Sequence, residues 1–406
     1  MSPYRKTRTP CRVQNGAALL VMLVIIILGS VALLLRSLNS SALQNTRDKI
    51  TADALAQAKE ALISYAISSE NVNGGAGTAR PGNFPCPDTD APGTSGYGDE
   101  QSSCSILGGT TIGRLPWKTL GLPELTDKAG EPLWYALSSN FRKSATTINS
   151  DTKATLQIYD RDGSTLLTSQ GNEAVAIIFS PGAIVGTQQR NSTADKITAS
   201  NYLDAANGID NATVNGPFIM ADKSDSFNDR LMIIRTRDFM PVIEKRIAKE
   251  LKVIFENYLA DNGVYPYPAP FSSCKSISTC GSNTNICRGR IPYNAQPVDW
   301  WGSYSLPSAP GGSSWFTNNL WYRVIYYSAG TSRLTSNPPG CNATLNVSGN
   351  SAAAMFFMPG TPLGSVARTY ANNNLSWYLD DAENQNTDDN YVTPTSNSND
   401  QLYILP

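Results

Sequence analysis

The longest apolar run in the chain lies near its N-terminus. The segment Ala17 to Leu35 has 19 residues without a charged side chain and would span about 28 Å as a helix, enough to cross a bilayer core. Arg36 ends the run, and a basic stretch precedes it, which includes Arg5, Lys6, Arg8 and Arg12. The pattern predicts a transmembrane helix over 17–35 whose basic side stays in the cytoplasm.

Helical periodicity continues beyond this segment. No Pro occurs from Ala17 to Arg80, and small or apolar residues recur every three or four positions at Ile50, Ala54, Ala58, Ala61 and Tyr65. We therefore expect an amphipathic stem helix over 36–73 whose small-residue face packs on a sheet. An anchor helix followed by a separate amphipathic helix would have a similar geometry.

Short apolar or aromatic runs bounded by Gly, Pro and Asn predict β-strands in the remainder. They are Leu133–Leu137, Val175–Phe179, Leu231–Ile234, Trp321–Tyr327, Ala354–Phe357 and Leu402–Leu405. A second amphipathic helix is expected from about Pro241 to Asp261. Helices packed on antiparallel sheets belong to the α+β class.

Several motifs occur twice in the same order, at separations between 171 and 190 residues. The pairs include Thr46-Arg47-Asp48 with Thr236-Arg237-Asp238, Gly113-Arg114-Leu115-Pro116-Trp117 with Gly289-Arg290-Ile291-Pro292-Tyr293, Leu133-Trp134-Tyr135 with Leu320-Trp321-Tyr322, Tyr202-Leu203-Asp204 with Tyr378-Leu379-Asp380, and Asn228-Asp229 with Asn399-Asp400. This order predicts two homologous modules, roughly 43–237 and 238–406, and the head of the first module is expected over 74–237. Two unrelated segments of similar composition are the alternative.

A short basic leader, residues 1–16, ends at Gln14-Asn15-Gly16 and is followed directly by the apolar Ala17-Ala18-Leu19-Leu20. This junction resembles the prepilin-type segment of type IV pilins and type II secretion pseudopilins. The resemblance implies that a prepilin peptidase cuts after Gly16 and methylates Ala17. It also implies that subunits assemble through one helix, which presents Ala17, Leu20, Val21, Val24, Leu28 and Leu35.

Val21 departs from the family pattern, because most such pilins have Glu at the fifth mature position. A carboxylate inside a membrane requires a partner, and the large pseudopilin that caps the type II secretion pseudopilus lacks it. The resemblance therefore implies a minor or tip subunit. A plain membrane anchor and a conventional signal peptide cut near Ser40-Ser41-Ala42 are the competing interpretations.

The expected fold is α+β, with a long N-terminal transmembrane helix stem followed by two pilin-like modules, each a helix packed on a short-stranded antiparallel sheet. The expected protein is a structural subunit of a type IV pilus or a pseudopilus. Its partners would be other pilins or pseudopilins, the prepilin peptidase and inner-membrane lipid, and not nucleic acid. It would cross the inner membrane once, with its N-terminus cytoplasmic and its bulk periplasmic or extracellular in a filament.

Composition narrows the possible chemistry. The formal net charge is −1, and the chain has no histidine. The missing histidine excludes Ser-His-Asp and Cys-His catalysis and every metal site that needs an imidazole. No pair of carboxylates stands out either, so we expect no enzyme and no cofactor.

Seven cysteines are present, and leader cleavage would remove Cys11. The six that remain are Cys86, Cys104, Cys274, Cys280, Cys287 and Cys341. An even number suits disulfides in an oxidising compartment. Cys86 and Cys104 form the natural first pair, worth about 3 kcal/mol. The other four allow three pairings, and their spacing is unlike that of zinc ribbons.

Two further clusters are open to more than one interpretation. Asp88, Asp90, Asp160 and Asp162 could donate oxygens to calcium, although turn formation explains them as well. No other metal ligand set is expected. A dense aromatic cluster includes Trp300, Trp301, Tyr304, Trp315, Trp321, Tyr322, Tyr326 and Tyr327. It could form a module core, or it could serve the alternative function, a membrane-anchored extracytoplasmic adhesin or carbohydrate-binding protein.

Overall fold

The computed structural model describes residues 22–23, 45–68, 80–102, 104, 112–143, 147–168, 172, 174–214, 216–298, 315–363, 368, 374–386 and 388–406. The chain forms two compact units, Met1–Asp53 and Ala54–Pro406. The second unit holds most of both predicted modules. The expected boundary between the modules, at 237/238, falls inside a single continuous helix.

The described chain is built from short strands and a smaller set of helices. The strands are β1 (Ile112–Arg114), β2 (Trp134–Leu137), β3 (Ile158–Asp160), β4 (Ala174–Ser180), β5 (Ala205–Ala206), β6 (Ile209–Asp210), β7 (Phe218–Met220), β8 (Arg230–Arg235), β9 (Arg288–Arg290), β10 (Tyr326–Ala329), β11 (Leu345–Val347), β12 (Asn350–Ala352), β13 (Ala354–Met358), β14 (Asn390–Tyr391) and β15 (Gln401–Leu405). The helices are 45–68, α2 (Thr193–Lys196), α3 (Thr236–Asn262), α5 (Trp315–Asn318), α6 (Trp321–Val324) and α7 (Ala382–Gln385).

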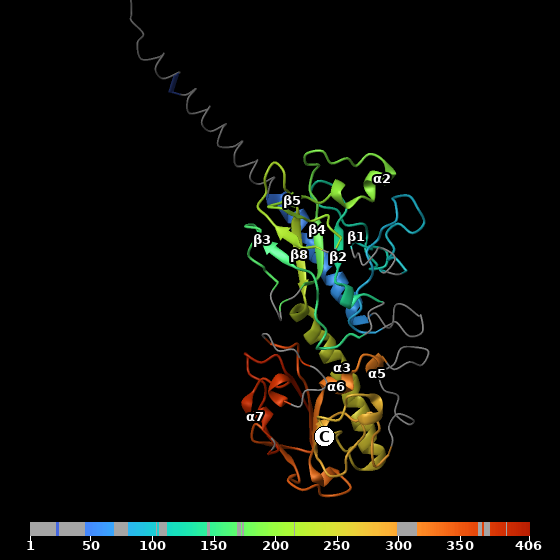
Figure 1. The fold of residues 1–406 in the computed structure, drawn as a ribbon, viewed down its shortest axis with the longest axis vertical. Helices are drawn as coiled ribbons and strands as arrows, with labels where there is room; N and C mark the ends of the chain where they lie inside the picture. The colour runs from blue at the N-terminus through green and yellow to red at the C-terminus, as the bar shows by residue number, and fades with distance from the viewer. Residues whose placement is uncertain are drawn as a thin grey trace, which may run out of the picture. The chain divides into compact units, whose positions relative to one another are not determined.

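The first sheet is antiparallel and has the order β1-β2-β4-β8 (Figure 1). The first helix shares one buried core with this sheet, to which it contributes the small and apolar positions Ala54, Leu55, Ala58, Leu62 and Ala66. Lys59 fixes the helix to the end of β8, since its Nζ donates to the carbonyl oxygen of Ile233 at 3.2 Å and lies 2.9 Å from Asp238. The predicted packing of a small-residue face on a sheet is therefore present.

The second sheet is antiparallel and has the order β9-β10-β13-β15. Helix α3 precedes it in the chain and packs against β13 and β15. The Phe255 ring lies 4.8 Å from the ring of Tyr327 and 6.0 Å from that of Phe356. Each sheet is thus covered by the helix that comes before it in sequence.

The two sheets agree in register as well as in strand order. Gly113 pairs with Tyr135 in the first sheet, and Gly289 pairs with Tyr327 in the second. Each glycine lies against the backbone of a preceding loop, where an added Cβ would come 2.5 Å from the Asp88 carbonyl oxygen or 2.0 Å from that of Ala269. Only glycine leaves room for this contact in either copy.

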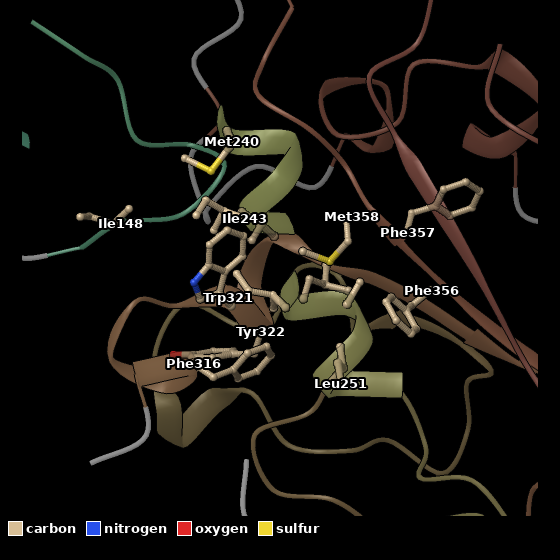
Figure 2. Packing of buried hydrophobic residues seen from close by; sticks show 14 of the residues in the cluster. Ile148, Met240, Ile243, Leu251, Phe316, Trp321, Tyr322, Phe356, Phe357 and Met358 are labelled. Carbon is tan, nitrogen blue, oxygen red and sulfur yellow. The ribbon is translucent and has the colours of Figure 1, made fainter. Parts of the chain in front are cut away.

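Helix α3 belongs to the packing of both modules. Near its start, Phe239 makes an edge-to-face contact with Phe84 at 5.1 Å. Figure 2 shows Met240 beside Ile148 of the first module and Ile243 beside Trp321 of the second. One buried cluster therefore runs from the first sheet, along α3, to the second.

Buried polar groups also join the modules. The Asn319 Oδ1 accepts hydrogen bonds from Arg80 Nη1 at 2.9 Å and from the Ile148 amide at 2.8 Å. On α3, the fully buried Glu244 accepts from Ser150 at 2.5 Å and from Gln401 at 3.2 Å. These bonds fix the orientation of the modules, because buried polar groups lose stability when they are left unpaired.

The structure corrects one predicted strand and one helix boundary. Residues Trp321–Tyr327 were expected to form a strand, but α6 occupies Trp321–Val324 and β10 begins at Tyr326. The positive φ of Leu320 (59°) starts the turn into α6, so Leu320-Trp321-Tyr322 is not the counterpart of the first module's β2. Helix α3 begins at Thr236 rather than near Pro241, since Asp238 caps it by accepting from the Arg235 amide at 3.1 Å.

The predicted membrane stem and location also need correction. Within the described ranges, no helix is both long and apolar enough to cross a membrane. The longest helix there, α3, is amphipathic, with exposed charged side chains along the side opposite its buried face. The expected transmembrane stem and single-pass inner-membrane arrangement are therefore not found; residues 17–35 lie outside the described part except for 22 and 23. The α+β class itself is observed, with several sheets.

Three disulfides are present among the residues that the structure describes. Cys86 is bonded to Cys104, as predicted. The pairing that the sequence left open is Cys274 with Cys280 and Cys287 with Cys341. Each bond lies within one module.

Candidate functional site

Most of the residues predicted for processing and assembly lie outside the described part. Gly16, Ala17, Leu20, Val21, Val24, Leu28 and Leu35 belong to this group. Cleavage and assembly through this segment therefore stay predictions.

Three of the four calcium candidates accept from main-chain amides, and the fourth, Asp90, accepts from Gln101 Nε2 at 2.9 Å. Asp88 accepts from the amides of Asp90 at 2.8 Å and Gly98 at 2.9 Å. Asp162 accepts from the amides of Ser164 and Thr165, and Asp160 accepts from that of Arg161. In the described part of the chain, no three acidic or cysteine side chains gather as a metal site would require. The turn interpretation explains these contacts.

The described members of the aromatic cluster are buried. Trp315, Trp321, Tyr322, Tyr326 and Tyr327 expose 3% or less of their surface and belong to the main core. Trp300, Trp301 and Tyr304 lie outside the described residues. The five described side chains therefore fill the second module and leave no face for a ligand.

A buried arginine holds a loop behind each sheet. Arg190 donates to the carbonyl oxygens of Gly182 at 2.9 Å and Asn201 at 2.8 Å, and its guanidinium lies 4.3 Å from the Tyr202 ring. The second module repeats this arrangement with Arg368, which donates to the carbonyl oxygens of Gly360, Pro359 and Trp377 and lies 5.2 Å from the Tyr378 ring.

A pair of aspartates completes each network. The Asp204 amide donates to Asp229 Oδ2 at 2.9 Å, and the Asn228 amide donates to Asp204 Oδ2 at 2.6 Å. In the second module, Asp380 and Asp400 are linked in the same way, at 2.8 Å, and the Asn399 amide donates to Asp380 at 2.9 Å. The same contacts therefore occur twice in the molecule.

Burial raises the pKa of one aspartate in each pair. Desolvation, followed by the charge of Asp204, raises the pKa of Asp229 to about 8. Desolvation likewise raises the pKa of Asp400 to about 8. Paired carboxyls with separated pKa values can transfer protons in enzymes. Here the carboxyls accept from main-chain amides and so link two loops of the same module, which favours a structural role.

Sequence reasoning found these aspartates as repeated motifs but missed the two arginines. Each arginine follows the glycine of its Pro-Gly turn by eight residues, Gly182 to Arg190 and Gly360 to Arg368. This spacing, read together with the repeated turns, could have revealed them.

The first module also has a small hollow at the end of β1. Its apolar wall is formed by Leu115, Leu125, Pro132 and Leu133. Its polar lining is Tyr97, Arg114, Trp117 and Glu124. The empty space, including the open mouth, is about 210 Å³. The enclosed cavity itself is about 10 Å³, which leaves room for about one water molecule.

Two buried N–H groups in this lining have no acceptor within the described residues. They are Arg114 Nη2 and Trp117 Nε1. Arg114 is only 3% exposed. Its guanidinium lies 4.7 Å from the Tyr97 ring, and its Nε lies 3.7 Å from Asp88 Oδ2. The guanidinium is therefore held firmly while one of its N–H groups stays unpaired.

An acceptor and balancing charges lie close to these donors. The exposed Glu124 accepts a hydrogen bond from the Tyr97 hydroxyl. Desolvation raises the pKa of Asp88 above its usual range. Lys118 lies over the Trp117 ring, with its Nζ 5.3 Å from the ring centroid. Of these charged side chains, Arg114 and Glu124 line the hollow, while Asp88 and Lys118 contact its lining residues.

The corresponding position of the second module is filled. Arg290 pairs across the sheet as Arg114 does, and its bridge to Ala269 matches the bridge from Arg114 to Asp88. Its guanidinium lies 4.0 Å from the ring of Phe271. By position along the loop, Phe271 corresponds to Asp90 in the first module. The second module has an aromatic ring where the first has a short acid.

No family model matches the chain, and neither a curated protein nor a solved structure matches it. The resemblance to pilins and pseudopilins therefore rests on the residues around Gly16 and on the order of elements.

Proposed function

We propose that this protein is a structural assembly subunit of a type IV pilus or a type II secretion-like pseudopilus, of the minor or tip kind, processed after Gly16. The observation that carries the proposal is the repeated layout, in which a helix leads into a four-stranded antiparallel sheet that it covers. The first of these helices follows the prepilin-like junction in the chain, as the stem helix of a pilin does.

The contacts between the modules support a structural role. Strand β8 passes directly into α3, and α3 packs in both modules. Asn319 and Glu244 add buried hydrogen bonds across the junction. A subunit built in this way presents two heads as one body, which suits a cap or initiator better than a repeating filament subunit.

The chemistry of the chain supports a non-catalytic role. Histidine is missing from the sequence, and the paired aspartates hold loops by accepting from main-chain amides. The three disulfides stabilise the heads without a ligand. We propose that these heads select partners by their surfaces and perform no reaction.

The test is the mass of the mature N-terminus after co-expression with a prepilin peptidase. We expect a methylated Ala17, and we expect Gly16→Leu to leave the precursor intact. Ala42→Leu serves as the matched control, because it blocks a conventional signal-peptide site and should leave cleavage unchanged. A mature start near Leu43, or normal cleavage of Gly16→Leu, would contradict the proposal.

A further inference from the structure

One loop of the first module, residues 147–152, contributes several polar contacts with the second module. Its Ile148 amide donates to Asn319 Oδ1 at 2.8 Å. Two residues further on, the Ser150 hydroxyl donates to the Glu244 carboxyl group on α3 at 2.5 Å. A change in the charge of Glu244 therefore acts directly on a contact between the modules.

The Glu244 carboxyl group is fully buried between neutral donors. It accepts from Ser150 and, at 3.2 Å, from the side-chain amide of Gln401 on β15. The cation nearby, Arg368, lies against Asp151 instead, with 3.6 Å between Nη1 and Oδ1. Desolvation raises the pKa of Glu244 to about 7. Burial without a paired cation favours the protonated carboxyl group.

A protonated Glu244 keeps both of its contacts. A serine hydroxyl can accept as well as donate, so the protonated oxygen donates to Ser150 while the other oxygen still accepts from Gln401. Ionisation keeps the same partners but leaves a negative charge in the junction. That charge is hydrated once the loop moves away from α3 and water reaches the carboxylate. The closed and open states of the loop thus differ in their affinity for one proton.

The other titratable groups that face Glu244 are Asp151 of the loop, Arg368 of the second module and Tyr403 of β15. Burial raises the pKa of Tyr403 to about 12, so this hydroxyl stays neutral at physiological pH. Desolvation raises the pKa of Asp151 to about 6, and the charge of Arg368 lowers it. The Asp151 side chain is 23% exposed, whereas Glu244 is fully buried. Glu244 is therefore the group that depends most on the closed loop.

The nearby Asp400 belongs to a different contact. Its carboxyl group accepts from the Asp380 amide at 2.8 Å, inside the second module. Movement of the loop 147–152 leaves that bond in place. The high pKa of Asp400 therefore affects the unfolding of its module and not the opening of the loop.

From these contacts, we propose that the loop 147–152 and Glu244 form a proton-dependent latch between the two modules. Protonated Glu244 holds the loop closed on α3, and loss of the proton releases it. The latch makes the connection between the modules looser as the pH rises. It neither requires nor affects processing at Gly16, so the test of that processing and the test of the latch have separate results.

The experiment is amide hydrogen exchange of the full chain by NMR between pH 5 and 9. The reporter is the Ile148 amide, because it donates across the junction to Asn319. Its protection factor, corrected for the intrinsic effect of pH, should fall at least tenfold from pH 5 and level off above about pH 7. The Ser138 amide, which donates to Val175 inside the first module, should stay at least tenfold more protected at pH 8, because only unfolding of the module exposes it.

Glu244→Gln imitates the protonated carboxyl group. Its Oε1 can accept from Gln401 and its Nε2 can donate to Ser150, so Ile148 should stay protected up to pH 9. Glu250→Gln is the matched control, since it makes the same change on the same helix in a side chain that is 36% exposed. It should leave the fall in protection unchanged.

Two further variants keep the test decisive even if Glu244→Gln fails to fold. The Ser150 hydrogen bond lowers the pKa of Glu244, and the charge of Asp151 raises it. Ser150→Ala should therefore move the pH at which protection levels off upward, and Asp151→Asn should move it downward. A loop that is merely structural would not shift in opposite directions.

Four results would overturn the latch. They are a protection factor of Ile148 that does not change with pH, an equal fall in the parent chain and in Glu244→Gln, equal protection of Ile148 and Ser138 at pH 8, and shifts in the same direction, or no shift, for Ser150→Ala and Asp151→Asn.

Discussion

The two modules share a scaffold and differ in what surrounds one arginine. In both, a helix covers a four-stranded sheet, and a buried arginine and two aspartates hold the loop on the other side. At the end of the first strand, Arg114 adjoins a hollow, whereas Arg290 lies against Phe271. The features that both modules share are those that the fold requires. The features that differ, such as the hollow and Phe271, are not required by the fold.

The largest loss of stability is expected when the buried Arg190 or Arg368 is replaced. Arg190→Met and Arg368→Met each leave several loop carbonyls without their donor, and each leaves an acid without its partner. Removing one member of such a buried pair costs about 3–5 kcal/mol. Chemical denaturation should show similar losses in the free energy of unfolding for both variants if the two networks stabilise their modules equally.

Arg161→Met is the control for these variants. It breaks a pair with Asp222 whose side chains are 68% and 80% exposed, so its effect should stay below about 0.5 kcal/mol. A large loss in one module and a small one in the other would show that the two networks are not equivalent.

The disulfides should rank by the length of chain that they close. Cys287–Cys341 closes 54 residues and Cys86–Cys104 closes 18. Loop entropy gives about 4 kcal/mol for the first and about 3 kcal/mol for the second. Double Cys→Ser variants, followed by thermal unfolding, measure the difference. The Cys274–Cys280 bond closes 6 residues and should contribute least, about 2 kcal/mol; the reverse order would refute the entropic ranking.

Local patterns predicted the repeated scaffold well. Strands such as β4 and β13 are fully buried apolar runs bounded by Gly and Pro, and the structure places them where the sequence did. The Gly-Arg motifs at 113–114 and 289–290 occupy matching positions in the two sheets. These strands could be predicted because hydrophobic periodicity and turn residues are local features that span only a few residues.

The errors came from interactions between distant segments. Residues Trp321–Tyr327 have the composition of a strand, but tertiary packing places Trp321 and Tyr322 in a short buried helix. The hollow was not visible in the sequence, because it depends on Tyr97 and Glu124 meeting Arg114 from separate loops. The carbohydrate alternative had been linked to an aromatic cluster whose five described members the structure buries in the second module.

The paired aspartates give both modules the same pH dependence. Their raised pKa values, about 8 for Asp229 and Asp400, mean that the folded state holds protons that the unfolded state releases near pH 4. Below about pH 4 both states are protonated, so these groups do not lower the free energy of unfolding. That free energy falls as the pH rises from about 4 toward 8. Asp229→Asn and Asp400→Asn should each flatten this fall and stabilise the chain by roughly 2–3 kcal/mol at pH 8.

Melting temperatures between pH 5 and 8 measure this effect. Asp222→Asn changes an exposed carboxyl and should leave the slope as it is. A flattened slope in one module alone would mean that the two pairs have separate roles. An unchanged slope in both would show that these carboxyls are ionised in the folded protein.

The smallest expected change in stability comes from a comparison of Trp117, beside the hollow, with Tyr267, in the filled core of the second module. Trp117→Phe removes a buried N–H that has no acceptor among the described residues. The relief of its desolvation cost, about 1–3 kcal/mol, offsets the contacts that the smaller ring loses, so Trp117→Phe should not destabilise the chain. Tyr267→Phe in the second module is the contrast, because its buried hydroxyl bonds Thr335 at 2.8 Å and Ser336 at 2.7 Å; it should lose about 1 kcal/mol. Equal losses in thermal unfolding would mean that the Trp117 N–H is already satisfied within the protein.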